Sequence, residues 1–245
     1  MLEFPENYDF IRNGGWWGGV GCEIWRMELK HWTFGPSQEN TWLIASAEGR
    51  GIVIDPGMSN AAEEARFERD VDGIEVVACW LTHAHLDHVA GAAYIARKYG
   101  CVPQVAEADA ATYRQAPLAG RVYGFEIADL PEPTWRDWSK RQEVDCLGEP
   151  VEVRFAPGHA PGHVVFVHHV AEWVLAGDVL FRESVGRTDL PGGDAEVLRR
   201  SIERELFDLP ESFAVHCGHG PSTTIGHEKA RNPFVNAAGT GMMQG

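Results

Sequence analysis

Short apolar runs separated by turn signals are the feature that most limits how this chain can fold. They are rich in Val, Ile, Phe and Trp and too short for ordinary helices, which is typical of buried strands. The expected strands span residues 41–46, 51–55, 74–81, 151–156, 163–170, 172–177 and 213–217. Helical patterns lie between some of them, at residues 59–69, 88–99, 107–115 and 194–207, the last with Asp194 as expected N-cap. The interspersed order and the hairpin-like pairs at 41–55 and 151–177 predict an α/β (α+β) fold with two mixed β-sheets flanked by helices.

The length and composition fit one domain over residues 1–245. A chain of 245 residues with 44% hydrophobic residues can bury a substantial core. A Trp/Gly-rich N-terminal segment (12–36) and a charged, proline-containing stretch (116–146) stand apart, and the second resembles an insertion or lid. Two interpretations of both segments stay open: they wall a pocket, or they pack as ordinary surface.

Charge and cysteine usage narrow the function classes. The chain has 21 Lys+Arg against 36 Asp+Glu, and its net charge of −15 disfavours nucleic acids and anionic membranes as partners. It shows neither a secretory signal pattern nor an apolar stretch of about 18 residues. The five cysteines are scattered and never form C-x-x-C, which predicts free thiols in a reducing compartment. We therefore expect a cytoplasmic protein that acts on a small molecule.

The stretch "THAHLDHVAG", residues 82–91, follows a buried-strand pattern and concentrates ligand-type side chains. In the loop, His83 and His85 can converge on one point while Asp87 and His88 turn toward a neighbouring one, and imidazole and carboxylate suit divalent metals. Solvated polar residues at a helix start are the alternative, with Asp87 as an N-cap. A Ser/His/Asp triad is disfavoured because no G-x-S-x-G occurs in the sequence.

Other expected strands also end at ligand-type residues. "FAPGHAPGH" (155–163) presents His159, "LAGDVLF" (175–181) ends at Asp178, and "HCGHGPST" (216–223) presents His219 between glycines. Taken singly, each stretch is also an ordinary turn signal. Together with 82–91 they lead to the hypothesis that several strand ends converge on a single site.

In this order, T-H-x-H-x-D-H, P-G-H-x-P-G-H, G-D-x-L-F and G-H-G-P resemble the metallo-β-lactamase-fold hydrolases, most closely the glyoxalase II-like (hydroxyacylglutathione hydrolase-like) branch. "SQENTWLI", "VIDPG", "SVGRTDLPGGD" and "STTIGHEKARNPF" extend the resemblance over roughly residues 30–234. It implies a four-layer αββα sandwich with a dinuclear metal centre at one edge. Only "VNAAGTGMMQG" follows the matched region, so we expect no separate C-terminal helical domain of the kind that helps glyoxalase II bind glutathione.

The resemblance also implies a ligand set. One metal would be held by His83, His85 and His159, the other by Asp87, His88 and His219, and Asp178 would bridge the two. Zinc is the expected metal, with iron and manganese as alternatives. Asp55, in the D-P-G turn, would orient a ligand imidazole from the second shell, and His163 would be a second-shell or structural residue.

Two metals about 3.5–4 Å apart can share a water and lower its pKa toward ~7, which supplies a hydroxide to attack a carbonyl. The sequence therefore predicts a dinuclear metal-dependent hydrolase of a thioester (acylglutathione-like) or related acyl substrate, with Asp87 and Asp178 orienting the hydroxide. The alternative is a mononuclear iron persulfide dioxygenase that uses His83, His159 and Asp178. A metal-dependent nuclease ranks lower because of the net charge of −15.

Overall fold

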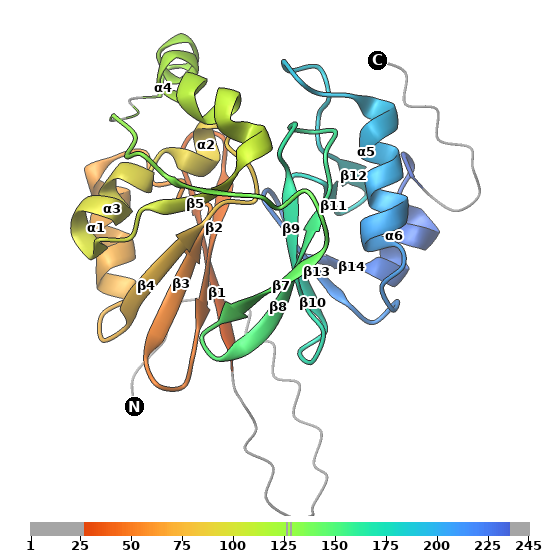
Figure 1. The fold of residues 1–245 in the computed structure, drawn as a ribbon, viewed down its shortest axis with the longest axis horizontal. Helices are drawn as coiled ribbons and strands as arrows, with labels where there is room; N and C mark the ends of the chain where they lie inside the picture. The colour runs from red at the N-terminus through yellow and green to blue at the C-terminus, as the bar shows by residue number, and fades with distance from the viewer. Residues whose placement is uncertain (1–26, 126, 128, 236–245) are drawn as a thin grey trace, which may run out of the picture.

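The structure is a computed structural model that describes residues 27–125, 127 and 129–235. Most of the Trp/Gly-rich segment (12–36) lies outside these residues, and its described end enters the first strand. Figure 1 shows two β-sheets side by side, with helices on the outer side of each. This arrangement confirms the expected α/β fold with two mixed sheets flanked by helices.

The first sheet has six strands in the order β1-β2-β3-β4-β5-β6. β1 to β3 pair antiparallel and β3 to β6 pair parallel, so the sheet is mixed. Its strands are β1 (Glu28–Phe34), β2 (Glu39–Ala45), β3 (Arg50–Ile54), β4 (Glu75–Trp80), β5 (Pro103–Ala106) and β6 (Thr134–Arg136). The helices of this half are α1 (Ala61–Asp70), α2 (Leu86–Val89), α3 (Ala92–Tyr99), the short 3-10 helix η1 (Glu107–Asp109) and α4 (Ala110–Tyr123).

The second sheet also has six strands, in the order β14-β13-β10-β9-β8-β7. Only β10 and β13 pair parallel. Its strands are β7 (Gln142–Cys146), β8 (Glu149–Phe155), β9 (Val164–His168), β10 (Trp173–Gly177), β13 (Ala214–Cys217) and β14 (Thr223–Thr224). The hairpin β11 (Leu180–Phe181) and β12 (Ser184–Val185) follows β10, and the helices are α5 (Ala195–Ser201), the π-helix η2 (Ile202–Leu206) and α6 (Ile225–Arg231).

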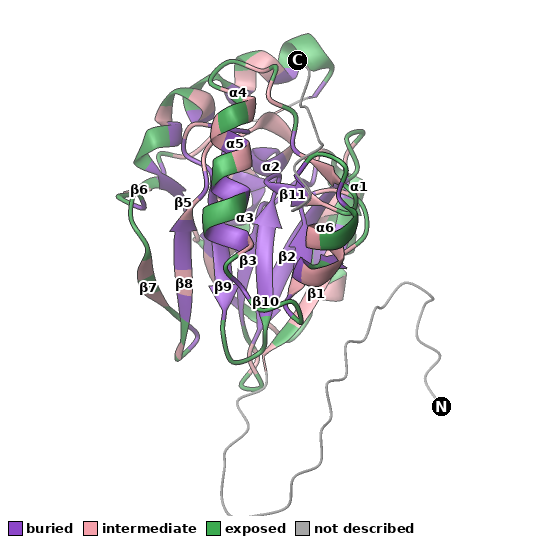
Figure 2. Cartoon of the chain, turned by 90° about the vertical axis from the view of Figure 1, so that its right-hand side faces the viewer, coloured by how far each residue is buried: buried purple, intermediate pink, exposed green. Residues whose placement is uncertain are grey.

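Alternating side chains divide the core into separate layers. On β2, Leu43 packs toward the helices of its own half, while Ile44 packs between the two sheets. On β9, Val165 faces α5 and Phe166 faces the first sheet. Figure 2 shows the central strands buried and the outward faces of the helices exposed. Both sheets are therefore covered on both faces, as a four-layer sandwich requires.

Each strand expected from the sequence is present, within about two residues at either end. The expected helix at 88–99 is divided into α2 and α3. The division occurs at Gly91, whose N–H donates to the carbonyl of Pro56 at 2.7 Å instead of continuing α2. The expected N-cap at Asp194 is confirmed, since its carboxylate accepts from Val197 N at 2.9 Å.

The stretch 116–146 holds regular structure. α4 runs through Pro117 to Tyr123, although the sequence predicted a helix end at residue 115. One internal proline removes only one helix hydrogen bond, and the buried residues Tyr113, Ala116 and Gly120 hold the helix against the core. The stretch then adds β6 to the first sheet and β7 to the second.

Phe166 tests the packing between the sheets. Its ring is fully buried, with centroids 5.2 Å from Trp80 and 5.7 Å from Trp138. Because the Phe166→Ala cavity lies between two sheets that cannot collapse into it, we expect the free energy of unfolding to fall by about 3–5 kcal/mol. Urea unfolding measures the change, with Val170→Ala (85% exposed) as a control expected within about 0.5 kcal/mol of wild type. A loss below roughly 1 kcal/mol for Phe166→Ala would contradict this packing.

Candidate metal centre

Ligand-type side chains lie where strands of both sheets end. His83 follows β4, and Asp87 and His88 are carried by α2, whose N-cap is His85. From the other sheet, His159 lies in the loop after β8, Asp178 directly follows β10, and His219 follows β13. The residues that the sequence predicted for one site are therefore brought together at the facing edges of the two sheets.

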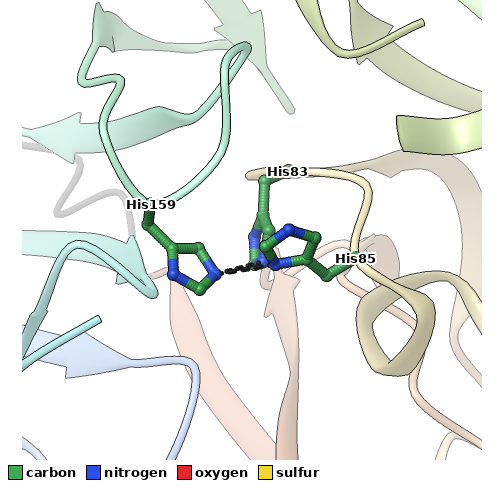
Figure 3. A group of neighbouring side chains, drawn as sticks. All are labelled: His83, His85 and His159. Carbon is green, nitrogen blue, oxygen red and sulfur yellow. Dashed lines mark hydrogen bonds between the residues drawn. The ribbon is translucent and has the colours of Figure 1, made fainter. Parts of the chain in front are cut away.

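The first group consists of His83, His85 and His159 (Figure 3). Nε2 of His159 lies 2.8 Å from Nδ1 of His85 and 3.2 Å from Nε2 of His83. His83 and His159 are buried, and His85 is partly exposed. One half of the molecule supplies two imidazoles and the other supplies the third, all directed at one point.

The opposite ring nitrogens determine which atoms are left for a metal. Nδ1 of His159 lies 2.8 Å from the carbonyl of Arg187, which can only accept, so Nδ1 carries the proton. Thr82 donates its hydroxyl to Asp55, so its oxygen accepts from Nδ1 of His83 at 3.0 Å. In the neutral form of both rings, Nε2 is thus the nitrogen without a proton, and it faces the shared point as in metal-binding histidines.

The second group consists of Asp87, His88 and His219. Nε2 of His219 lies 3.5 Å from Oδ2 of Asp87, and its Nδ1 faces the carbonyls of Ser37 and Gln38 at 3.1 and 3.2 Å. This third imidazole too is held by its Nδ1 and directs Nε2 into the site.

Asp178 lies between the two groups. Its Oδ2 is 3.4 Å from Nε2 of His159 and 3.5 Å from Nε2 of His219. Its Oδ1 is 3.4 Å from Nε2 of His88. One carboxylate thus reaches ligand atoms of both groups, which is the position that a bridging ligand needs. The assignment of these residues as ligands stays a prediction.

The two groups differ electrostatically. Burial and the neighbouring imidazole of His159 lower the pKa of His85 to about 3, so this ring is neutral near pH 7. In the second group burial opposes protonation, but the carboxylates of Asp178 and Asp87 outweigh it and raise the pKa of His219 to about 9. His85 can therefore bind a cation without losing a proton, whereas a cation bound by His219 would displace one.

Buried atoms without partners test whether a metal fits. Within the described part of the chain, Nε2 of His88 and Oδ1 of Asp178 are buried and have no hydrogen-bond partner. A buried polar atom left unpaired costs roughly 1–3 kcal/mol, and more when it is charged. A divalent cation satisfies an imidazole nitrogen and a carboxylate oxygen together. The set of imidazole and carboxylate donors therefore fits divalent metal ions.

Asp55 and His163, the predicted second-shell residues, both contact the groups. Asp55 accepts from the backbone N–H of Thr82 at 2.7 Å and lies 3.1 Å from Nδ1 of His88. His163 accepts from the backbone N–H of Asp178 at 3.0 Å and stacks on His83 with centroids 4.6 Å apart. They hold the loops and rings that carry ligand atoms.

Sequence reasoning missed two buried carboxylates beside the site. Glu39 is fully buried, accepts from the hydroxyl of Thr41 at 2.9 Å, and lies 3.9 Å from Nδ1 of His88. Asp109 is equally buried and accepts from the backbone N–H groups of Ala84 and Gly162. An acidic residue in the same short strand as the apolar run "WLIA", as in "ENTWLIA", was a signal for the first. For Asp109 the sequence held no such signal.

Three other ligand-type residues near the last motif lie outside the two groups found among the described residues. His216 is buried against Trp42, with centroids 4.7 Å apart, and bonds Ser222. His227 pairs with Glu183 at 2.9 Å. Cys217 is fully buried, with its sulfur toward the carbonyl of Val215.

A fold with two helix-covered mixed sheets and a His/Asp cluster at their facing edges defines a metal-binding α/β protein. The family model of the metallo-beta-lactamase superfamily matches residues 34–219, and the chain belongs to this superfamily. Among the described residues, no helix combines the length and apolarity needed to cross a membrane.

Named relatives agree with this assignment. The chain is 35% identical over 203 residues to the hydroxyacylglutathione hydrolase GloC of Haemophilus influenzae, covering 82% of this chain and 94% of that protein. It is 37% identical over 202 residues to a probable metallo-hydrolase of Streptococcus pyogenes, covering 81% and 86%. Among solved structures, TTHA1623 in a di-iron-bound form superposes with a TM-score of 0.74 at 38% identity, covering 84% and 99%.

His216 gives a prediction about pH. Burial lowers its pKa to about 4, below the ordinary value of about 6.5. As the pH falls below 6.5, His216 is protonated in the unfolded chain but stays neutral in the folded chain. The free energy of unfolding therefore decreases between pH 6.5 and about 4. We expect His216→Gln to reduce the loss between pH 7 and pH 5 by about 1–2 kcal/mol. Urea unfolding of both proteins with a chelator present measures this, and equal losses in both would contradict it.

Proposed function

We propose that the protein is a dinuclear metal-dependent hydrolase that cleaves a thioester or a related acyl bond. The observation that carries the proposal is the position of Asp178, whose two oxygens lie within 3.5 Å of imidazole nitrogens from both groups. Neighbouring groups of ligand atoms with a shared carboxylate are the arrangement that suits two divalent ions, zinc being our expectation and iron or manganese the alternatives.

The residues of the two groups would hold two metal ions and orient a water molecule. His83, His85 and His159 would hold one ion, Asp87, His88 and His219 the other, and Asp178 would contact both. Bound divalent ions would activate a water molecule and polarise the substrate carbonyl. The carboxylates of Asp87 and Asp178 can accept hydrogen bonds from that water and so orient it toward the carbonyl carbon.

The described residues offer no activated nucleophile at the centre. Cys217 is the last residue of β13, the strand that leads to His219, but burial raises the pKa of its thiol to about 12 and its sulfur faces a backbone carbonyl. A thiolate has a low proton affinity compared with an alkoxide, so a thioester can be cleaved without a strong general acid. The site therefore suits attack by water and departure of a thiolate.

Two observations bear on the substrate class. The relative named hydroxyacylglutathione hydrolase aligns over 94% of its length, which supports glutathione thioesters as the first class to test. The net charge of −15 disfavours a nucleic-acid substrate. We propose a small acyl thioester as substrate and the cytoplasm as location.

His85→Ala tests the ligand assignment. Removing one of three imidazoles from the first group should lower the bound metal by about one equivalent and reduce thioester hydrolysis more than about 100-fold, beyond the loss typical of second-shell changes. His169→Ala is the matched control, since this histidine is exposed and pairs with Glu152 away from the centre. Metal analysis and hydrolysis of an acylglutathione panel provide the readouts. A variant that keeps both metal and activity would overturn the assignment.

The alternative of a mononuclear iron dioxygenase has one supporting observation. Nε2 of His159 lies 3.2 Å from Nε2 of His83 and 3.4 Å from Oδ2 of Asp178. These three residues therefore form a two-histidine, one-carboxylate set. Oxygen uptake with glutathione persulfide, measured beside acylglutathione hydrolysis on protein of known metal content, separates the two. One equivalent of iron with oxygen consumption would overturn the hydrolase proposal.

A further inference from the structure

We propose that Asp109 is a positioning residue of the metal centre. It fixes the distance between the loop that carries His83 and His85 and the loop that carries His159. The proposal rests on the metal-dependent function proposed above. Asp109 is the last residue of η1, in the first half of the molecule, and its carboxylate accepts from two loop backbone N–H groups. Its effect would pass through the backbone of the two loops that carry the three-histidine group.

The carboxylate of Asp109 joins these loops directly. Oδ2 accepts from the N–H of Ala84 at 2.7 Å, and Ala84 lies between His83 and His85. Oδ1 accepts from the N–H of Gly162 at 3.0 Å, in the loop that carries His159. One rigid planar group thus connects the backbone beside two ligands from one sheet with the backbone beside the third ligand from the other.

The side chain of Asp109 does not serve as a helix cap. It is the N-cap residue of α4, where an aspartate usually accepts from the helix N–H groups. Its side chain makes no such capping hydrogen bond and accepts from the helix only through the hydroxyl of Thr112, at 3.3 Å, among the residues that the structure describes. The carboxylate is fully buried, so its charge is balanced by the loop N–H groups and not by water.

The backbone of Asp109 and the loop that carries His159 are packed closely at Gly162. A Cβ placed on Gly162 would meet the backbone nitrogen of Asp109 at 2.5 Å and its Cβ at 2.6 Å. The loop can approach Asp109 this closely only because residue 162 is glycine. Because Nδ1 of His85 and Nε2 of His159 are 2.8 Å apart, a shift of a few tenths of an ångström between the loops would reach the metal position directly.

The test compares variants that disturb the bridge with one that does not. Asp109→Asn replaces one acceptor oxygen by an NH₂ group that faces a backbone N–H, so one of the two loop bonds is lost. Gly162→Ala widens the same contact without changing charge. Thr112→Val is the matched control, because it removes only the hydroxyl contact of 3.3 Å and keeps both loop bonds.

The readouts are the binding of Co²⁺ to metal-free protein and the visible absorption of bound Co²⁺, which reports its coordination geometry. We expect Asp109→Asn and Gly162→Ala to weaken the binding of one equivalent of Co²⁺ about 10–100-fold and to alter the spectrum of the bound ion. Thr112→Val should bind Co²⁺ like wild type. Repeating the titration in a His219→Ala background, where the three-histidine group is intact, should show the same loss.

Thermal unfolding of the metal-free proteins separates positioning from stability. If Asp109→Asn and Gly162→Ala melt earlier but bind Co²⁺ with the affinity and spectrum of wild type, Asp109 is only structural and the proposal is overturned. Should Asp109→Asn fail to fold, the Gly162→Ala result decides in the same way. A wild-type protein that binds no Co²⁺ overturns both proposals, whereas metal binding without thioester hydrolysis overturns only the proposed function.

Discussion

The carboxylate of Asp178 is the point on which the rest of the structure depends. It lies between two imidazole groups that different strand ends bring together. Without a cation, such a cluster buries imidazole nitrogens that face one another and leaves Oδ1 of Asp178 without a hydrogen-bond partner, and both are costly in an apolar interior. The free-energy cost of holding the cluster must therefore be offset elsewhere in the fold. The packed layers on both faces of each sheet provide this stabilisation.

Close backbone approach is the second requirement of the centre. Gly218 follows β13 directly before His219, and a Cβ there would meet Oδ1 of Asp178 at 2.2 Å. Gly177 ends β10 directly before Asp178, with φ at +48° and Thr82 in the space that a Cβ would take. Glycines therefore allow the ends of parallel neighbours β10 and β13 to meet the loop of the first sheet.

Much of this could be predicted from the sequence because the signals are local. Apolar runs identified β2, β3, β4, β8, β9, β10 and β13, and the histidines and aspartates at strand ends identified the residues that the structure brings together. The short edge strands β6, β11, β12 and β14 carry too few residues for a periodicity. The division of the helix at Gly91 depends on the carbonyl of Pro56, and the role of Asp109 on two distant loops. Such tertiary hydrogen bonds leave no pattern along the chain.

The local charge of a metal-loaded centre would let an acidic protein favour the proposed hydrolysis, which develops negative charge. Two divalent ions would bring four positive charges, of which the ligand carboxylates Asp87 and Asp178 would offset two, so the ions together with their ligands would carry a net positive charge despite the net charge of −15. The overall charge acts over distances that salt screens within about 10 Å, whereas the centre acts at contact in a partly buried site. In the proposed hydrolysis, negative charge that develops at the centre would therefore be stabilised by its immediate surroundings, and the acidic surface would affect mainly which partners approach.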